Sequence, residues 1–179
     1  MQFPDTSAFL QSELQWLQKL MQFRSRDTQT DVRLIGELQP TNPQSSESIL
    51  YSKIIHEYKL GFEDRLLIIL GLVPTIAPQF MDKELFLWGR QAGHATAQPI
   101  WGVIYGSMYK GALPTAQLFL YILVGDVFEK RLFATRKLLN FNYNSQKQNI
   151  VFISDVPVAE PKTAGLLSIN DAFICQLID

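Results

Sequence analysis

Residues 102–126 read G-V-I-Y-G-S-M-Y-K-G-A-L-P-T-A-Q-L-F-L-Y-I-L-V-G-D and consist of two contrasting halves. The first half places glycines and a proline around one lysine, which is typical of either a phosphate-binding loop or a turn between packed helices. The second half is apolar and ends at Gly125, which predicts a buried helix over Ala116–Val124 with Thr115 as its N-cap. This segment therefore predicts a packed helical fold.

The order of residues in the glycine-rich half argues against nucleotide binding. A phosphate-binding loop has the pattern G-x-x-x-x-G-K-[ST], in which backbone amides surround the phosphates and the lysine follows the second glycine. In this chain Lys110 precedes Gly111, and Ala112 and Leu113 stand where the lysine and the hydroxyl residue belong. We therefore expect a structural turn, no cofactor and no catalytic activity in this chain.

The overall composition is that of a packed globular protein. The chain has 179 residues, of which 47% are hydrophobic and 18% charged, enough for one substantial domain. Its 16 basic and 17 acidic side chains give a formal net charge of -1, so nucleic acid is not the expected main partner. Cys175 is the single cysteine, which excludes an intramolecular disulfide, and its apolar neighbours predict a buried, inert thiol.

The longest apolar runs are too short for a membrane span. They cover residues 66–78 and 113–125, whereas a helix that crosses a bilayer needs about 20 residues. The N-terminus M-Q-F-P-D-T lacks the basic and apolar regions of a signal peptide. We expect a soluble, cytoplasmic protein without membrane insertion.

Apolar residues recur at helical spacing along most of the chain. They predict helices over residues 9–23, 49–58, 62–73, 76–86, 116–124, 128–139 and 171–177. Residues 62–73 are apolar on nearly all sides, which predicts a central helix that Pro74 ends. Asp126 is the predicted cap of the helix that follows it, and Asn170 or Asp171 is the predicted cap of the last one. Residues 88–111 are expected to be irregular.

Two short segments near the C-terminus have the composition of strands. Residues 150–153 and 165–169 are predicted to form an antiparallel hairpin, after a polar turn over residues 140–149. Two helices followed by a hairpin and a short helix indicate a winged-helix-like module. The predicted fold is therefore mainly α, a multi-helix domain with a C-terminal winged-helix-like module that carries a small β-hairpin. Residues 1–48, a helix and a polar loop, are expected to pack on residues 49–179 as one compact unit.

Aromatic residues around the glycine-rich loop are the candidate site. Aromatic side chains near glycine and arginine favour either a contact surface for a protein partner or anchors that pack an irregular segment onto the domain. The aromatic residues are Trp88, Trp101, Tyr105 and Tyr109. The predicted partner contacts are Trp101, Tyr105, Tyr109 and Lys110. A third hypothesis is a small enzyme that uses His94 as a general base.

A basic cluster supports the alternative function of a DNA-binding winged helix. Its residues are Lys130, Arg131, Arg136 and Lys137, all within the predicted helix over residues 128–139. In that hypothesis the helix enters the major groove of DNA. The same residues also suit a solvated helix face.

The order of these motifs resembles the N-terminal region of bacterial AAA+ ATPases that are encoded with contractile injection systems. Residues 106–115 (G-S-M-Y-K-G-A-L-P-T) are similar to the family's G-T-x-H-R-G-F-L-P-T run, and an apolar helix follows in both. Residues 62–74 (F-E-D-R-L-L-I-I-L-G-L-V-P) are similar to the family's F-E-R-x-x-L-L-L-A-L-A-P helix. Residues 165–170 (G-L-L-S-I-N) correspond to its closing hairpin. The likeness covers roughly residues 49–179.

The resemblance implies a regulatory, protein-binding domain that stands ahead of an ATPase module. That module, expected C-terminal to this chain, would supply the nucleotide chemistry and an oligomeric ring. The implied partner is a protein such as a component of the injection apparatus. The chain is then either part of a longer protein or a stand-alone relative of the front domain. Tyr109 replaces the family's histidine, and Ala116 and Gln117 replace its Gly-Glu pair, which changes any partner surface on that loop.

Overall fold

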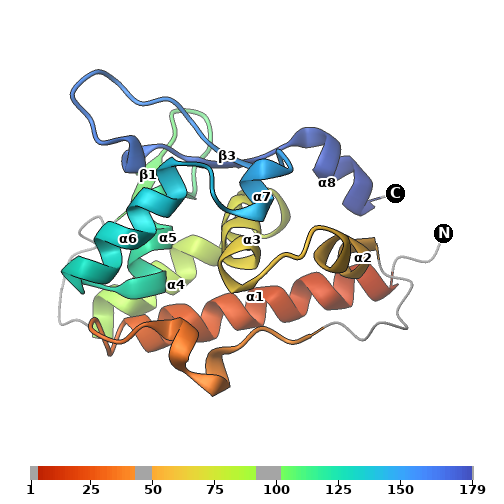
Figure 1. Cartoon of the computed structure of the whole chain (residues 1–179), viewed down its shortest axis with the longest axis horizontal. Helices are drawn as coiled ribbons and strands as arrows, with labels where there is room; N and C mark the ends of the chain where they lie inside the picture. Colours follow the sequence, from red (N-terminus) through yellow and green to blue (C-terminus); the bar gives the residue numbers. More distant parts are fainter. Residues whose placement is uncertain (1–3, 43–49, 92–101, 179) are drawn as a thin grey trace.

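The computed structural model describes residues 4–42, 50–91 and 102–178, and helices make up most of them (Figure 1). The helices are α1 (Pro4–Arg24), α2 (Leu50–Glu57), α3 (Phe62–Ile76), α4 (Phe80–Gln91), α5 (Ala116–Val124), α6 (Phe128–Leu139), α7 (Asn144–Lys147) and α8 (Asp171–Ile178). Short 3-10 turns are η1 (Val32–Leu34), η2 (Gly36–Leu38) and η3 (Lys162–Ala164). The antiparallel strand pairs are β1 (Val103–Tyr105) with β2 (Ala112–Pro114) and β3 (Val151–Ile153) with β4 (Leu167–Ile169). The predicted mainly helical fold with a small hairpin is confirmed.

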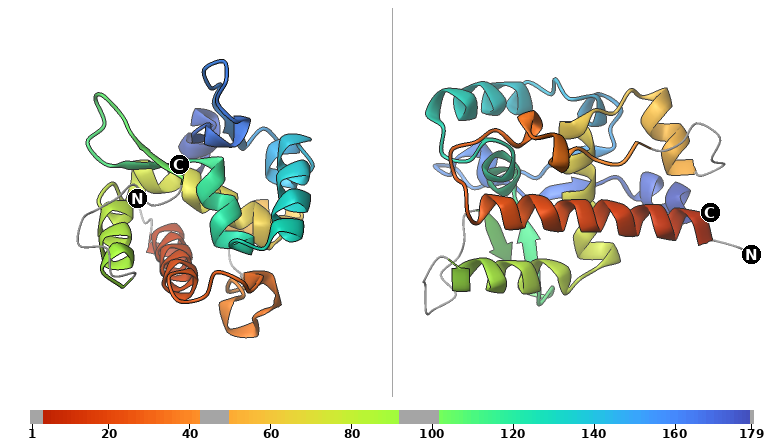
Figure 2. Two further views of the ribbon diagram at one scale, coloured as in Figure 1. Left: turned by 90° about the vertical axis from the view of Figure 1, so that its left-hand side faces the viewer. Right: turned by 90° about the horizontal axis from the view of Figure 1, so that it is seen from below.

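Helix α3 lies at the centre of the fold (Figures 1 and 2). It contacts α1, α4, α5 and α7 and strands from both hairpins, so residues 64–73 are all buried. The predicted central helix is confirmed, but it continues past Pro74 to Ile76. Proline removes only its own amide donor, and the Ala77 amide still donates to the Val73 carbonyl at 2.9 Å.

A buried ion pair joins α1 to α3. The side chains of Glu13 and Arg65 are 1% and 3% exposed, and the guanidinium donates to both carboxylate oxygens. Arg65 also donates to the Thr41 carbonyl at 2.9 Å and lies 5.8 Å from the ring centres of both Phe9 and Trp16. Arg65 therefore connects three segments that are distant in the sequence.

The end of α1 caps the end of α5. The fully buried Arg24 donates to the carbonyls of Asp27 and Thr30 at 2.8 Å and to that of Ile122 at 2.9 Å. Gly125 follows with a φ of 62°, and a Cβ there would lie 2.1 Å from the Thr28 carbonyl oxygen. The α5 carbonyls that the helix itself leaves unpaired are thus bound by a charged side chain from elsewhere in the chain.

The predicted cap of α6 is wrong. The Asp126 amide donates to the Thr28 carbonyl at 2.8 Å, and Val127 occupies the N-cap position without a side-chain hydrogen bond. Asp126 therefore lies one residue before the N-cap position. Its backbone is held by the hydrogen bond to Thr28, and the helix begins only after it.

Residues 88–111 are more regular than predicted where the structure describes them. Helix α4 starts at Phe80, later than expected, and runs to Gln91. It carries the buried Trp88, whose ring stacks on Tyr121 at 5.6 Å. Strands β1 and β2 form a hairpin that the sequence did not reveal, because three-residue strands are too short to show an alternating pattern.

The C-terminal hairpin agrees with its prediction. Strands β3 and β4 pair antiparallel, with Val151 opposite Ile169 and Ile153 opposite Leu167. The Asn170 side chain accepts from the Ala172 amide at 2.9 Å, so Asn170 is the cap of α8, as one of the two predictions had it. The predicted polar turn over residues 140–149 contains the short helix α7 instead.

The prediction for Cys175 is wrong, because its side chain is exposed. The buried face of α8 contains Phe173 and Leu177, one turn apart, and Cys175 points away from that face. A thiol reagent such as DTNB is therefore expected to modify the native protein at one equivalent per chain. Labelling that needed denaturant would contradict the exposure, and Cys175→Ser serves as the blank.

The described part of the chain holds no single helix with both the length and the hydropathy that a bilayer span requires. The pair Phe62–Ile76 and Phe80–Arg90 passes that test only together, with a bend of 111° between them.

Candidate functional site

The glycine-rich loop forms the tip of the β1–β2 hairpin. Val103 lies opposite Pro114 and Tyr105 opposite Ala112, so the loop of residues 106–111 joins two strands. A phosphate-binding loop leads from a strand into a helix N-terminus, where the amides converge on the anion. This loop leads back into a strand, which is the geometry of a turn.

The open end of the hairpin is held at Thr115. Both its amide and its hydroxyl donate to the Gly102 carbonyl, at 2.8 and 2.7 Å. Thr115 occupies the N-cap position of α5 as predicted, but its hydroxyl binds Gly102 and makes no capping hydrogen bond to the helix. Strand β2 therefore passes directly into α5.

Tyr109 anchors the hairpin tip to the junction of α3 and α4. Its hydroxyl lies 3.1 Å from the Pro78 carbonyl oxygen and 3.3 Å from that of Pro74. A Cβ on Gly111 would lie 2.6 Å from the Tyr109 ring, so this glycine makes room for the tyrosine. The Ala112 amide donates to the Asp82 carboxylate at 3.3 Å. The loop is thus tied to two helices, although its tip projects from the fold.

Apolar side chains are exposed along this hairpin. Met108 is 92% exposed, Tyr105 58% and Ile104 42%, and Lys110 is exposed beside them. Burial raises the pKa of the phenols of Tyr105 and Tyr109, and the nearby Asp82 carboxylate raises it further. The hairpin therefore offers apolar surface, neutral phenol groups and one ammonium group to a partner.

The structure brings three of the four predicted contact residues together on this hairpin. Tyr105 and Lys110 are exposed, whereas Tyr109 is half-buried and serves as the anchor. Trp101 and His94 lie outside the described residues. Ile104 and Met108 are exposed on the same hairpin and were not predicted, because apolar residues in this stretch suit core positions as well as surface ones.

The basic cluster on α6 is partly used within the fold. The Lys137 ammonium lies 3.3 Å from Glu63 and 4.2 Å from the centre of the Tyr143 ring. The Arg131 guanidinium donates to the Gly125 carbonyl at 3.2 Å. Lys130 is half-buried, and Arg136 alone of the four is exposed. These contacts do not favour the DNA-binding alternative, which needs the cluster on a free face.

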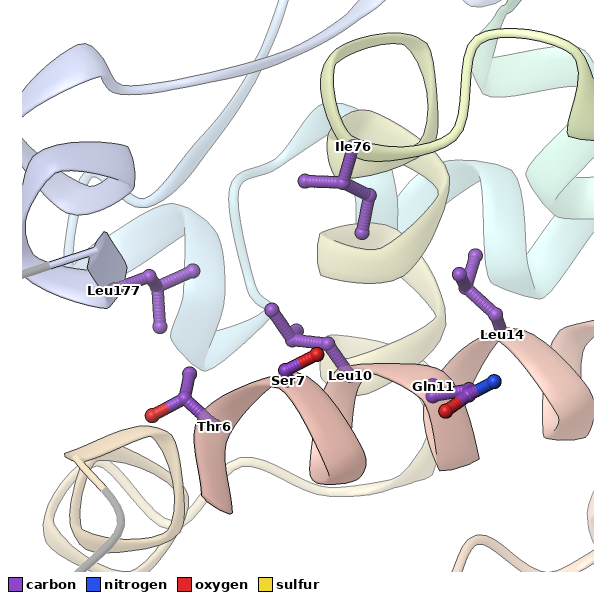
Figure 3. A pocket seen from close by; sticks show the side chains of 7 residues that line it. All are labelled: Thr6, Ser7, Leu10, Gln11, Leu14, Ile76 and Leu177. Atoms are coloured by element: carbon purple, nitrogen blue, oxygen red, sulfur yellow. The ribbon is translucent and has the colours of Figure 1, made fainter. Parts of the chain in front are cut away.

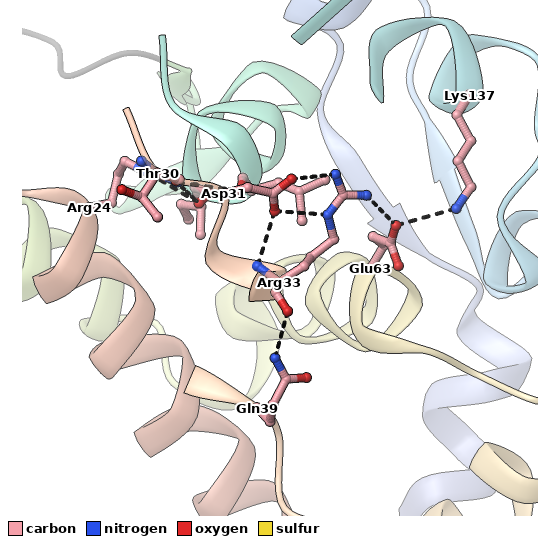
Figure 4. A network of polar contacts seen from close by, with 9 residues as sticks. Arg24, Thr30, Asp31, Arg33, Gln39, Glu63 and Lys137 are labelled. Atoms are coloured by element: carbon pink, nitrogen blue, oxygen red, sulfur yellow. Dashed lines mark hydrogen bonds and ion pairs between the residues drawn. The ribbon is translucent and has the colours of Figure 1, made fainter. Parts of the chain in front are cut away.

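Lys137 belongs to a polar network that joins η1, α3 and α6 (Figure 4). Arg33 bridges Asp31 at 2.7 Å and Glu63 at 2.9 Å, and Glu63 also binds Lys137. Burial alone would raise the pKa of Asp31 and Glu63, but hydrogen bonds from Arg33 outweigh it, and both pKa values fall below their usual range. The carboxylates are therefore ionised at neutral pH, and the network stabilises the packing of α6.

A groove of about 470 Å³ lies between α1, the end of α3 and α8 (Figure 3). Its apolar side chains are Leu10, Leu14, Ile76 and Leu177, and Thr6, Ser7 and Gln11 provide the polar groups. Its lining carries no ionisable side chain among the described residues, so it offers packing contacts and neutral hydrogen bonds.

Within the described ranges, no group of three or more His, Cys, Asp or Glu side chains is placed to hold a metal ion. No family model matches this chain, and neither a curated protein nor a solved structure matches it. The resemblance to the front domain of AAA+ ATPases is therefore an expectation from the sequence motifs alone.

Proposed function

We propose that this chain is a non-catalytic, protein-binding domain of the kind that stands ahead of an AAA+ ATPase module, with that module C-terminal to it. The observation that carries the proposal is the β1–β2 hairpin, which presents Tyr105, Met108 and Ile104 to solvent on an anchored support. Its partner is a protein, and the family resemblance points to a component of an injection apparatus.

The side-chain composition and the preformed backbone of this hairpin favour binding to a protein. Aromatic and methionine side chains supply large contact areas and are enriched in the centres of protein interfaces. Fixing a mobile loop costs binding free energy, and here the Tyr109 hydroxyl and the Asp82 contact hold the loop before any partner arrives. The preformed hairpin therefore lowers the entropic cost of docking.

The strand arrangement supports a winged-helix module within the domain. From β2 onward the order is β2, α5, α6, the short helix α7, β3, η3 and β4, so two main helices lie between a strand and the C-terminal hairpin. Thr115, directly after β2, forms a bridge with Leu166, directly before β4, and the Ala116 amide donates to the Gly165 carbonyl at 3.0 Å. This single bridge brings the end of β2 beside the start of β4, while β1–β2 and β3–β4 remain separate two-stranded sheets. The winged-helix module stays part of the proposal, supported by this contact and by the position of the C-terminal hairpin.

Substitutions on the hairpin test the proposal. The chain is to be titrated with purified protein components of a contractile injection apparatus. We expect Tyr105→Ala with Met108→Ala to weaken the complex by about 30-fold or more, because the loss of one central contact residue costs about 2 kcal/mol, which corresponds to that factor. Isothermal titration calorimetry gives the affinities.

Val158→Ala is the matched control for this titration. Val158 is fully exposed on the loop between β3 and β4, so its truncation tests for effects of surface apolar area alone. Equal losses in both variants, an unchanged affinity in the hairpin variant, or no binding by any component would each refute the proposed function. Unchanged circular dichroism shows that the variants are folded.

A further inference from the structure

The outward face of α6 carries three large apolar side chains that the fold does not cover. Phe128 is 76% exposed, Leu132 62% and Phe133 66%. Helix α6 lies at the edge of the molecule in Figure 1 and in the right-hand view of Figure 2. Its buried side, by contrast, includes Ala134 and Leu138. This apolar face is separate from the β1–β2 hairpin and takes no part in the proposed function.

One acidic and one basic residue complete this face. Glu129 and Arg136 are both exposed, and their separation of seven residues is about two helical turns, so they lie on one line along the helix. Leu132 and Phe133 lie near the middle of this line, one on each side of it. Residue 132 is one turn after residue 129, and residue 133 is one turn before residues 136 and 137. The face thus has an acid at one end, a base at the other and an apolar centre.

We infer that α6 pairs with α6 of a second copy of this chain, antiparallel, about a two-fold axis between Leu132 and Phe133. In this arrangement Glu129 of each chain faces Arg136 of the other, Leu132 packs against Leu132 of the other chain on one side of the axis, and Phe133 packs against Phe133 on the other side. An interface about a two-fold axis must be complementary to itself, and this pattern of opposite charges around an apolar centre meets that condition.

The charge distribution distinguishes a second copy from an anionic occupant. The other three basic residues of α6 are engaged elsewhere: Lys137 binds Glu63, Arg131 binds the Gly125 carbonyl, and the half-buried Lys130 interacts electrostatically with Asp31. The outward face therefore carries one acid and one base and has no net charge. Nucleic acid and anionic membranes are held by a surplus of basic side chains, which this face lacks. A second copy of this chain supplies both a base opposite Glu129 and an acid opposite Arg136.

Sedimentation velocity on the full chain tests this pairing. We expect a monomer–dimer equilibrium within a concentration range of about 10 μM to 1 mM, which is typical of a small interface. Leu132→Asp is expected to leave only monomer, whereas Tyr105→Ala on the hairpin leaves the dimer unchanged. A wild-type chain that stays monomeric across this range would overturn the inference.

Charge reversal provides the sharper test. Glu129→Arg and Arg136→Glu each place like charges opposite one another, so each variant alone is expected to be at least tenfold weaker as a dimer. In an equimolar mixture, the first variant offers two bases and the second two acids, so a heterodimer forms. The doubly reversed chain, E129R with R136E, regains the homodimer. Single reversals without effect, or a mixture that stays monomeric, would show that the chain does not pair through this face.

Discussion

Arg65→Met is expected to lower the free energy of unfolding by about 3–5 kcal/mol, because it leaves the Glu13 carboxylate buried without its partner. The two side chains are almost fully buried, and the guanidinium also binds the Thr41 carbonyl. Urea denaturation followed by tryptophan fluorescence measures the loss, since Trp16 lies beside the pair. A loss below about 1 kcal/mol would show that the pair contributes no more than an exposed one.

The matched control replaces both partners. Glu13→Leu with Arg65→Met leaves no buried charge, and buried ion pairs replaced by apolar residues of similar volume often retain stability. The double variant is therefore expected to be more stable than Arg65→Met alone. A double variant no more stable than Arg65→Met would contradict the explanation by an unpaired buried charge. A double variant less stable than the wild type would show that the attraction within the pair exceeds the cost of burying it.

The pH dependence of these variants has a definite sign. Burial raises the pKa of the Glu13 carboxyl from its ordinary value of 4.5, although Arg65 acts to lower it. A raised pKa means that the folded state binds a proton more tightly than the unfolded state, so this group favours folding as the pH falls below its folded pKa. Without Arg65 the pKa rises further, and the stability lost by Arg65→Met is partly recovered at acidic pH.

Arg24→Met is expected to destabilise the fold by about 3–5 kcal/mol. A hydrogen bond from a charged donor contributes about 1.5–3 kcal/mol, and this side chain donates to the carbonyls of Asp27, Thr30 and Ile122. Methionine fills the space of the alkyl stem but leaves these carbonyls without their donor. Chemical denaturation by urea measures the change in the free energy of unfolding.

Arg26→Met is the control, because Arg26 is exposed two residues further along the chain. Surface substitutions of this kind usually change stability by about 0.5 kcal/mol or less. Arg24→Lys separates charge from geometry, since an ammonium group cannot reproduce the planar fork that reaches several carbonyls. Near-normal stability of Arg24→Lys would show that charge alone is sufficient.

Strong local patterns predicted the core elements. The unbroken apolar composition of α3 and α5 indicated buried helices, and the strands at residues 150–153 and 165–169 were bounded by clear turn signals. What the sequence could not show depends on contacts between distant residues. Arg24 looks like an ordinary C-terminal cation of α1, and only the folded chain brings it to residue 122.

The candidate site was only partly predictable for the same reason. The sequence shows Tyr105, Tyr109 and Lys110 among glycines. It does not show that Tyr109 is the anchor and the other two are exposed, because this depends on the position of the Pro78 carbonyl. On α6 the basic residues indicated a candidate binding surface, whereas the helical spacing of Phe128 and Leu132 indicated core positions, although both are exposed. Exposure is a property of the whole packing, and periodicity gives only the face of a helix.

The bridge between Thr115 and Leu166 has a mechanical consequence. A force applied to the hairpin tip is transmitted along β2 to Thr115, where β2 meets both α5 and the start of β4. No flexible linker separates these elements at that residue. Three hydrogen bonds at Thr115 and Ala116 hold the end of β2, so we expect the β1–β2 hairpin to resist being pulled out of the fold. The end of β2 is therefore coupled directly to α5 and to the start of β4.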